Sequence, residues 1–374
     1  MMKTARDIKK IGIVTIDDYT NYGNRLQNYA LTKLLEERFQ VINGIRFFIK
    51  SDWEKSTNSR VKQLIRKCIP FIVIKKYRES VFKGTRNPNK RESKFWKFTS
   101  QYTLTQASVR NRYQAKKKLE KYGIDYFVAG SDQVWNPYWH GTDFDFLTFT
   151  PKEKRLSFAA SIGVDDIPAS ERERYKRNLM DMRYISVREK RAAEIVKELT
   201  GRDADITLDP TLLLDKAEWE RVARKPEALL EDKYICTYFL GDVPEAVDTF
   251  AAEKGLKIRA LNSENDMELY TIDPAEFLYV IKNAEYVLTD SFHAVAFSIK
   301  FNKEFYVFRR EGSKISSMFS RIETITQRFG LENRIQDREN IVEQSRVDSW
   351  DSIEDELMKE REKSIGKLCE MMED

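Results

Sequence analysis

Short apolar strands that alternate with helices, in two successive series, constrain the fold of this 374-residue chain more than any other feature. The first series begins with the strand 11–15 and closes at Asp209-Pro210, where a proline ends a strand. The second series begins with the strand 234–238 and runs to the strand 304–308. Strands and helices that alternate in this way form parallel sheets covered on both faces. The pattern predicts an α/β protein with two Rossmann-like, doubly wound domains that face a cleft.

The domain boundaries follow from the two series. Residues 1–210 are predicted to form the N-terminal domain, with a basic helical insertion at about 51–115. Residues 211–335 are predicted to form the C-terminal domain, and residues 336–374 a helical tail that packs on the body of the protein. A chain of this length can bury two cores of ordinary size.

The insertion is the most basic part of a chain whose net charge is only +5. Between Arg60 and Lys97 there are 13 Lys or Arg residues and 2 Glu residues. Such a surface suits an anionic membrane or a diphosphate-linked sugar acceptor. A solvated helical insertion explains the same pattern, and nucleic acid, the competing partner of a basic surface, is not expected.

His293 is one of only two histidines and is predicted to lie where the strand 286–289 meets the start of a helix. The crevice beyond the carboxyl ends of parallel strands is where such sheets bind ligands. A helix amino end favours a phosphate or carboxylate and lowers the pKa of a nearby histidine, unless a bound anion offsets the effect. An anionic substrate would therefore create its own general acid. A structural histidine that caps the helix explains the position equally well.

Polar loops follow two strands of the first series. The loop IDDYTNYGNRLQ contains a glycine that allows close backbone approach, but it has neither a G-x-G-x-x-G motif nor a P-loop lysine. In the second loop, GSDQVWN, the polar side chains suit sugar hydroxyls and the tryptophan suits a sugar ring. An Asx-turn with the tryptophan in the core is the alternative. The candidate acceptor-binding residues of the two loops are Asp18, Asn21, Tyr22, Asn24, Asp132, Gln133 and Trp135.

Arg188 lies where the strand 184–187 becomes a helix. An arginine in this position can clamp a phosphate or carboxylate through two parallel hydrogen bonds. A salt bridge to Glu189 or to another nearby acid is the alternative. Arg309 and Arg310 follow the strand 304–308, near the predicted anion site.

The remaining composition restricts the function class. The three cysteines are scattered, odd in number and without metal-ligand spacing, so we expect a reducing compartment and no metal site. No segment approaches the ~20 apolar residues of a membrane span, and the first residues lack the apolar core of a signal peptide. We expect a cytoplasmic location, and contact with the inner face of the membrane through residues 60–97 is a further hypothesis.

Six sequence blocks occur together in one order along most of the chain: NYGNRLQNYAL, GSDQVWN, SFAASIG, ISVRE, LDPTLLL and TDSFHAVAFSI. In these blocks the chain resembles the polysaccharide pyruvyl transferase family. The resemblance implies a glycosyltransferase-B-like architecture and transfer of the pyruvyl group of phosphoenolpyruvate to two hydroxyls of a sugar, which forms a ketal. It also implies a role in the synthesis of a bacterial capsule, exopolysaccharide or cell-wall polymer, and no cofactor besides the donor substrate.

The resemblance also implies roles for particular residues. His293 corresponds to the family's active-site histidine, and Arg188 to the arginine that contacts the donor. Ser291 stands where other members have an arginine, so one donor contact is missing or is replaced by Arg309 or Arg310. The candidate catalytic residues are His293, Arg188 and Asp290, and the candidate donor-binding residues are Arg188, Ser291, Phe292, His293, Arg309 and Arg310. Asp290, Asp132 and Asp18 are candidate bases for the acceptor hydroxyls.

Two other functions fit the same sequence. A glycosyltransferase of similar fold would use a nucleotide-sugar donor in the same cleft. A non-catalytic subunit of a polysaccharide assembly complex would keep the fold without the chemistry.

Overall fold

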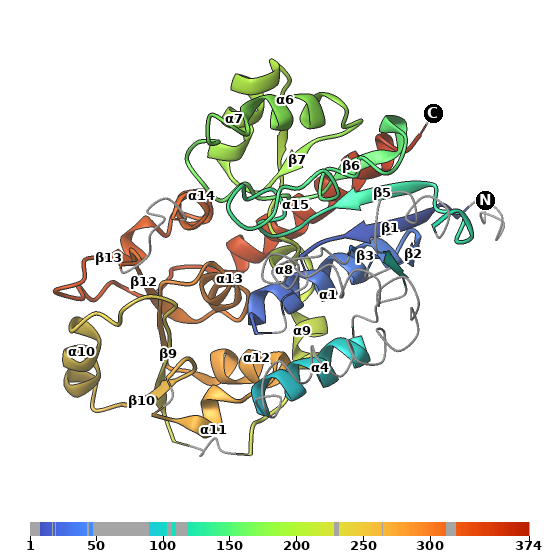
Figure 1. Cartoon of the computed structure of the whole chain (residues 1–374). Coiled ribbons are helices and arrows are strands. Elements are labelled where there is room, and N and C mark those ends of the chain that lie inside the picture. The colour runs from blue at the N-terminus through green and yellow to red at the C-terminus, as the bar shows by residue number, and fades with distance from the viewer. Residues whose placement is uncertain are drawn as a thin grey trace, which may run out of the picture.

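The computed structural model describes residues 8–16, 18, 20–42, 45–47, 90–102, 107–109, 119–227, 232–263, 265–311 and 319–373. Within these ranges the chain forms two parallel sheets, each flanked by helices, and the two sheets lie in separate lobes (Figure 1). The N-terminal lobe runs from blue to green and the C-terminal lobe from yellow to orange in the figure.

The N-terminal sheet has the strand order β2-β1-β5-β6, and all of its pairs are parallel. Isolated parallel bridges join β6 to the segment of β7, which in turn pairs with β8, and a separate parallel pair is formed by β3 and β4. The strands are β1 (Lys10–Val14), β2 (Gln40–Ile42), β3 (Ile45–Phe47), β4 (Ala107–Val109), β5 (Tyr126–Ala129), β6 (Arg155–Ser157), β7 (Ser186–Val187) and β8 (Asp205–Ile206).

The C-terminal sheet has the order β10-β9-β11-β12-β13 and is also parallel throughout. Its strands are β9 (Tyr234–Tyr238), β10 (Lys257–Ala260), β11 (Tyr286–Thr289), β12 (Glu304–Phe308) and β13 (Ile335–Gln336). In both sheets the strand order reverses direction beside the first strand, between β1 and β5 and between β9 and β11. At such a switch point the loops diverge and leave room for a ligand.

Each sheet is buried on both faces. In β5, Tyr126 and Val128 belong to one hydrophobic cluster, and Phe127 and Ala129 belong to another. The same alternation divides the residues of β12 between two clusters. Because successive side chains of a strand point to opposite faces, this division requires apolar layers on both sides of each sheet. The predicted α/β fold of two Rossmann-like units with parallel sheets is therefore confirmed.

The helices between the strands begin and end at the residues that the sequence provides as caps. The α12 helix begins with a capping box between Asp273 and Glu276 and has Pro274 at its first position. The α7 helix ends at Gly201, which adopts a φ of 73°. The helices are α1 (Tyr22–Glu36), α4 (Lys90–Tyr102), α6 (Arg172–Met180), α7 (Lys190–Thr200), α8 (Pro210–Leu213), α9 (Lys216–Val222), α10 (Ala246–Lys254), α11 (Met267–Tyr270), α12 (Pro274–Asn283), α13 (Phe292–Lys300), α14 (Ser320–Arg328) and α15 (Trp350–Glu370).

One hydrophobic cluster extends through both lobes. It contains residues of β1 and β5 from the N-terminal sheet and of β9, β11 and β12 from the C-terminal sheet. At its centre the ring of Tyr22, from α1, stacks on Phe277, from α12, with 4.5 Å between the ring centroids. The Tyr22 hydroxyl donates a hydrogen bond to the Ile272 carbonyl oxygen at 3.2 Å. The inner faces of the two units thus share a core, which brings their switch points close together.

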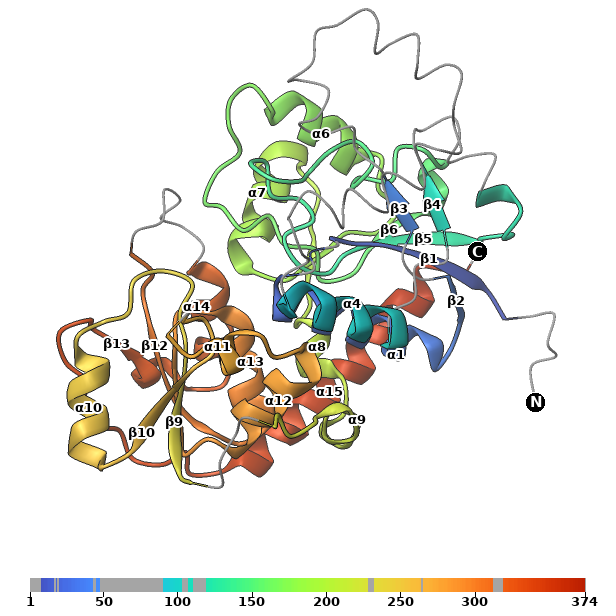
Figure 2. The same cartoon turned by 60° about the horizontal axis from the view of Figure 1, so that its bottom comes forward.

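The last helix, α15, runs from the C-terminal lobe back to the N-terminal lobe (Figures 1 and 2). Its predicted apolar residues are all buried: Ile353, Leu357, Ile365 and Leu368. Just beyond it, the Met372 carbonyl oxygen accepts a hydrogen bond from the Tyr126 hydroxyl of β5 at 3.1 Å. The helix therefore ties the two lobes together from the side.

Most of the basic insertion predicted at about 51–115 lies outside the described residues, and so does most of the predicted membrane contact at 60–97. Its described end, α4, packs against the C-terminal lobe. The Lys94 ammonium lies 2.9 Å from the Glu276 carboxylate of α12, and Arg91 donates to the Tyr270 carbonyl oxygen at 2.9 Å. In the part of the chain that the structure describes, no helix has the length and apolar character needed to cross a bilayer.

Candidate active site

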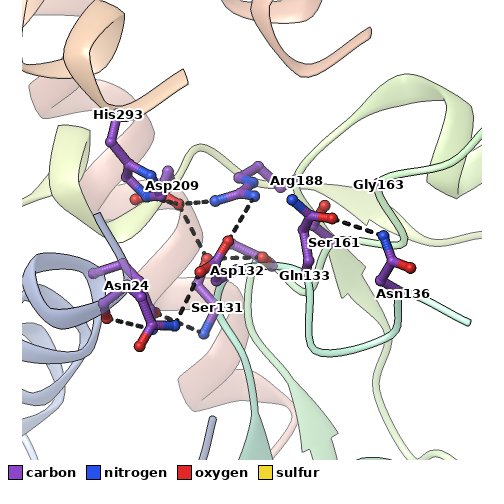
Figure 3. Close-up of polar contacts among 12 residues, drawn as sticks. Asn24, Ser131, Asp132, Gln133, Asn136, Ser161, Gly163, Arg188, Asp209 and His293 are labelled. Atoms are coloured by element: carbon purple, nitrogen blue, oxygen red, sulfur yellow. Dashed lines mark hydrogen bonds and ion pairs between the residues drawn. The ribbon is translucent and has the colours of Figure 1, made fainter. Parts of the chain in front are cut away.

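Polar side chains from both lobes lie close together in one cluster (Figure 3). Asn24 comes from the first turns of α1, Asp132 follows β5, Arg188 follows β7, and Asp209 follows β8. His293 lies in the first turn of α13, after β11. All five residues are at most 8% exposed. Each of the five residues follows the carboxyl end of a strand, so the fold brings them together although they are far apart in the sequence.

Asp209 is the centre of the cluster. Its Oδ2 accepts a hydrogen bond from the Ser131 hydroxyl at 3.2 Å and another from Nη1 of Arg188. Its Oδ1 accepts from the backbone N–H and the hydroxyl of Thr211, at 2.9 and 2.7 Å. Nε2 of His293 lies 3.8 Å from Oδ2. Burial alone would raise the pKa of Asp209, but the positive charge of Arg188 above all holds it below its usual value, so the carboxylate stays ionised.

Arg188 is fully buried and connects two carboxylates. Besides its bond to Asp209, its Nη2 donates to Oδ1 of Asp132 at 3.4 Å, and its guanidinium lies 4.5 Å from the centroid of the Phe292 ring. Its Nε has no hydrogen-bond partner within the described residues. Burial would lower the pKa of Arg188, but Asp209 and Asp132 raise it, so the cation is retained. The predicted salt bridge exists, with these two acids as partners.

His293 is fixed by the close approach of α1. A Cβ placed on Gly23 would lie 1.9 Å from Nδ1 of His293, so only glycine lets α1 pass against the ring. On the other side of the ring, Nε2 is buried and has no hydrogen-bond partner within the described part of the chain. Burial lowers the pKa of His293, although Asp209 and Asp132 oppose the shift. A ring held on one side with a buried, unpaired nitrogen on the other is suited to proton transfer.

Asp132 joins this cluster to α1. It has a φ of 66°, which turns its side chain toward Arg188, and its Oδ2 accepts from Nδ2 of Asn24 at 3.0 Å. The Asn24 Oδ1 in turn accepts from the backbone N–H of Asp18 at 2.9 Å. Despite burial, the charges of Arg188 and His293 hold the pKa of Asp132 well below its usual range. Two ionised carboxylates therefore share the cluster with one arginine and one histidine.

The α1 helix begins earlier than its sequence pattern suggests. The pattern predicts a start near residue 25, whereas the helix starts at Tyr22, because the Asn21 side chain caps it by accepting from the Asn24 N–H at 3.1 Å. The Tyr22 side chain is consequently directed into the shared core. Asp18 accepts hydrogen bonds from both the N–H and the hydroxyl of Thr20. Of the four acceptor candidates in this loop, only Asn24 bonds directly to the cluster.

Trp135 packs where the alternative interpretation places it. It is completely buried, its ring stacks on Phe146 at 5.1 Å, and its Nε1 donates to the Asp145 carbonyl oxygen. A ring enclosed in this way cannot stack on a sugar without leaving the core, so we do not retain it in the acceptor site.

The Asp290 carboxylate is engaged away from His293. Its Oδ1 accepts from the Leu240 N–H at 2.7 Å, and its Oδ2 accepts from the Gly241 N–H at 2.8 Å and from Nε of Arg310 at 2.9 Å. These bonds tie the loops after β9, β11 and β12 together. They give Asp290 and Arg310 a structural role that the sequence did not suggest, and both candidate functional roles stay predictions.

The remaining donor candidates differ in their surroundings. Ser291 is the N-cap residue of α13, but its side chain makes no capping hydrogen bond. Phe292 contributes the ring beneath Arg188. Arg309 has a side chain that is 63% exposed and donates to Glu323 at 2.7 Å. Arg309 therefore lies on the surface.

Two charged residues of the cluster region, Asp209 and Arg321, were not predicted from the sequence. Asp209 has a usable signal, since it ends a strand of the first series, but the adjoining proline suggested only a domain boundary. Arg321, in the first turn of α14, has no such signal. It is 6% exposed, and its guanidinium lies 5.6 Å from the centroid of the Phe292 ring. In the orientation of the Gln133 amide that satisfies both of its ends, the amide oxygen accepts from both terminal nitrogens of Arg321 at 3.2 Å.

The described residues contain no group of three or more His, Cys, Asp or Glu residues that could hold a metal ion. The buried guanidinium of Arg188, with Arg321 nearby, suits a small anionic ligand.

The chain was compared with curated proteins, with solved structures and with protein families. No curated protein matches the sequence. Among solved structures, S. aureus MnaA in complex with UDP is 11% identical with a TM-score of 0.48, and the match covers 98% of this chain and 91% of that one. The UDP-GlcNAc 2-epimerase of Neisseria meningitidis bound to UDP-GlcNAc is 6% identical with a TM-score of 0.48, and the match covers 98% and 93%. The wall teichoic acid polymerase TagF is 10% identical with a TM-score of 0.41, and the match covers 97% and 84%.

The family comparison is more specific. The model of the polysaccharide pyruvyl transferase family matches residues 21–312, a range that contains Asn24, Asp132, Arg188, Asp209 and His293. Because this match spans most of the chain, the protein belongs to the polysaccharide pyruvyl transferase family, a family of enzymes.

Proposed function

We propose that the protein transfers the pyruvyl group of phosphoenolpyruvate to two hydroxyls of a sugar, which forms a ketal and releases phosphate. The sugar belongs to a bacterial surface polysaccharide or to its lipid-linked precursor. The observation that carries the proposal is the buried, unpaired Nε2 of His293, 3.8 Å from the carboxylate that Arg188 binds. A proton donor and a buried guanidinium are the two groups that an anionic enol donor requires.

The charge of the cluster supports a donor with anionic groups. Arg188 is held in place by Asp209 and Asp132 and stacks on Phe292, so its guanidinium is already oriented before a ligand binds. A preorganised guanidinium binds a phosphate or carboxylate with less loss of conformational entropy than a mobile one. The first turn of α13, which carries Phe292 and His293, adds the partial positive charge of a helix amino end.

Binding of the anionic donor would favour the protonated form of His293, the proposed general acid. In the free protein, burial lowers the pKa of His293, which favours the neutral ring. A donor phosphate beside the ring adds negative charge, and this raises the pKa and favours proton uptake. Protonated Nε2 can then deliver the proton to the methylene carbon of phosphoenolpyruvate. General acid catalysis of this kind typically contributes about 10²–10⁴-fold.

The remaining steps balance without a further reactant. Protonation of the methylene carbon gives a methyl group and leaves C2 electrophilic, and the first sugar hydroxyl forms a bond to C2. The bond from C2 to the phosphate oxygen then breaks, and the second hydroxyl forms the second bond to C2. Of the two hydroxyl protons, one restores His293 and the other leaves on the phosphate. Asp132 and Asn24, from the N-terminal lobe, are the proposed contacts of the acceptor hydroxyls.

We propose no cofactor for this reaction, because protonation and addition need only the enzyme's acid and the two substrates. We propose a cytoplasmic site of action, where phosphoenolpyruvate is available. A lipid-diphosphate acceptor would approach from an anionic membrane surface bound by the segment 60–97, whose described end contains Lys90, Lys94 and Lys97.

The test is incubation of the purified protein with phosphoenolpyruvate and a panel of lipid-linked and nucleotide-linked sugars. We expect phosphate release together with a mass gain on one class of sugar. Failure of phosphoenolpyruvate to be consumed with any acceptor, combined with protection from thermal unfolding by a nucleoside diphosphate alone, would favour a nucleotide-sugar glycosyltransferase instead.

A further inference from the structure

Arg321 is a second buried arginine beside the cluster, and it comes from a different lobe than Arg188. Arg188 follows β7 of the N-terminal lobe, whereas Arg321 lies in α14, after β12 of the C-terminal lobe. Both guanidinium groups lie near the ring of Phe292, at 4.5 and 5.6 Å from its centroid. One phenylalanine ring at the start of α13 thus contacts an arginine from each lobe.

The two arginines have different hydrogen-bond partners. Arg188 donates to two carboxylates, Asp209 and Asp132. In the Gln133 amide orientation described above, Arg321 donates through both terminal nitrogens to the amide oxygen. Burial and the nearby positive charge of Arg188 lower the pKa of Arg321 to about 10, although the charges of Glu189 and Asp132 oppose this shift. Two buried cations close to each other repel, and a bound anion that contacts both would remove the repulsion.

The other arginines considered for this role are directed elsewhere. Arg310 donates to the carboxylate and the carbonyl oxygen of Asp290, at 2.9 and 3.1 Å. Arg309 is exposed and lies over Phe319 with its bond to Glu323. Neither of these two interactions involves the ring of Phe292, which Arg188 and Arg321 share.

We propose that Arg321 and Arg188 together bind a ligand with two anionic groups, one guanidinium for each group. This inference rests on the proposed function, in which the ligand is phosphoenolpyruvate with its phosphate and carboxylate. Arg321 would therefore determine the preference for a two-anion donor over a ligand with one anionic group. It would also couple donor binding to the arrangement of the lobes, since each lobe supplies one arginine.

Binding measurements on Arg321→Gln test the proposal. The probes are phosphoenolpyruvate, pyruvate and inorganic phosphate, each titrated calorimetrically into the full-length protein. We expect Arg321→Gln to raise the Kd for phosphoenolpyruvate about 10- to 100-fold, because it removes charged hydrogen bonds to one anionic group. Pyruvate and inorganic phosphate each carry one of the two anionic groups. The probe whose group Arg188 binds should keep its wild-type Kd in Arg321→Gln. The other probe then identifies the group that Arg321 contacts.

Arg328→Gln is the matched control, because Arg328 lies on the same helix and pairs with Glu356 and Glu360 of α15. It should bind phosphoenolpyruvate within about twofold of the wild type, because its ion pairs are with α15. Arg321→Lys keeps the charge but cannot present two parallel donors, and we expect it to weaken phosphoenolpyruvate binding by less than Arg321→Gln. It also replaces Arg321→Gln if that variant does not fold.

The outcomes separate this inference from the proposed function. If the wild type does not bind phosphoenolpyruvate, the proposed function fails and this inference fails with it. If the wild type binds it and Arg188→Gln weakens binding, but a folded Arg321 variant binds within about twofold of the wild type, only the role of Arg321 is overturned. The same conclusion follows if Arg309→Gln, and not Arg321→Gln, removes the preference for two anionic groups.

Discussion

Two buried carboxylates at strand ends, Asp209 and Asp290, are used in different ways. Asp290 bonds to two backbone N–H groups and to Arg310, and all of these contacts join loops of the C-terminal lobe. Asp209 bonds to Arg188, and it also lies 3.8 Å from His293, which comes from the other lobe. The first carboxylate fixes the fold, and the second connects the groups that a substrate would contact.

The unpaired polar atoms make the difference clearer. Within the described residues, Nε of Arg188 and Nε2 of His293 are buried without hydrogen-bond partners, and both belong to the Asp209 cluster. The polar side-chain atoms of Asp290 and Arg310 are not among such atoms. Native proteins rarely leave buried polar atoms unpaired, so two of them in one cluster indicate groups reserved for a ligand.

The largest expected effect is on catalysis by His293→Gln. Glutamine keeps a polar side chain of similar size but cannot deliver a proton, so we expect the turnover number to fall by about 10²–10⁴-fold. The stability should change little near neutral pH, because Nε2 has no hydrogen-bond partner among the described residues. Steady-state phosphate release and thermal unfolding measure the two quantities. An active variant would mean that Nε2 of His293 is not the general acid. The Asp209 cluster would then no longer differ in function from the Asp290 cluster.

Gly23→Ala tests whether the position of the ring matters as well as its chemistry. The added methyl would lie 1.9 Å from Nδ1 of His293, so the ring or α1 must move. A misplacement of about 1 Å can cost about 10²-fold in rate, and overpacking costs about 1–3 kcal/mol in stability. Gly366→Ala in α15 is the control, because a Cβ there meets no atom within 4 Å. That variant should keep full activity and gain stability by about 0.5–1 kcal/mol.

Asp290→Asn tests whether Asp290 stabilises the fold of the C-terminal lobe. The substitution removes the charge that Arg310 and two N–H groups bind, so we expect unfolding to become easier by about 1–3 kcal/mol. The rate per folded molecule should stay within a few-fold of the wild type. Denaturant unfolding and activity at low temperature measure the two effects. A loss of activity as large as that of His293→Gln, with unchanged stability, would instead support the catalytic role predicted for Asp290 from the sequence.

Strand-end position predicts which loops meet, but it does not predict which side chains in them face a ligand. Arg188, Asp132 and His293 were found because each follows an apolar strand, and all three lie in the cluster. Asp290 follows a strand too, yet its carboxylate turns to neighbouring backbone N–H groups, and the sequence contains no sign of that choice. Trp135 shows the same limit, since a tryptophan in a polar loop can equally well fill the core.

The position of Arg321 beside the cluster could not be predicted from the sequence. Arg321 lies one turn before Ile325 on the buried face of α14, but the periodicity does not show that this face packs beside α13 and the Phe292 ring. Periodicity is a local signal, whereas this contact depends on where two helices and a loop of the other lobe meet. The strands and capping residues were therefore predictable, and the second arginine was not.

The smallest expected effect is the pH dependence of the Asp209 cluster. Burial holds the pKa of His293 below its ordinary value of about 6.5, so the unfolded chain binds the proton more readily than the folded one. Stability from this source is present above about pH 6.5 and is lost as the pH falls toward the lower folded value. Asp209 and Asp132 have lowered pKa values as well, and their contribution is lost only at more acidic pH, below about 4.

Thermal unfolding of the wild type and His293→Gln between pH 7.5 and pH 5 separates the two sources. The wild type should lose stability relative to the variant as the pH falls through about 6, since only the wild type has the histidine to protonate. Phosphoenolpyruvate should reverse the trend, because its charge favours the protonated ring, and its binding should then take up a proton in titrations with buffers of different ionisation enthalpy. If the two melting curves stay parallel over this range, His293 is already protonated or already hydrogen-bonded in the free protein. The unpaired nitrogen would then cease to distinguish the Asp209 cluster from the Asp290 cluster.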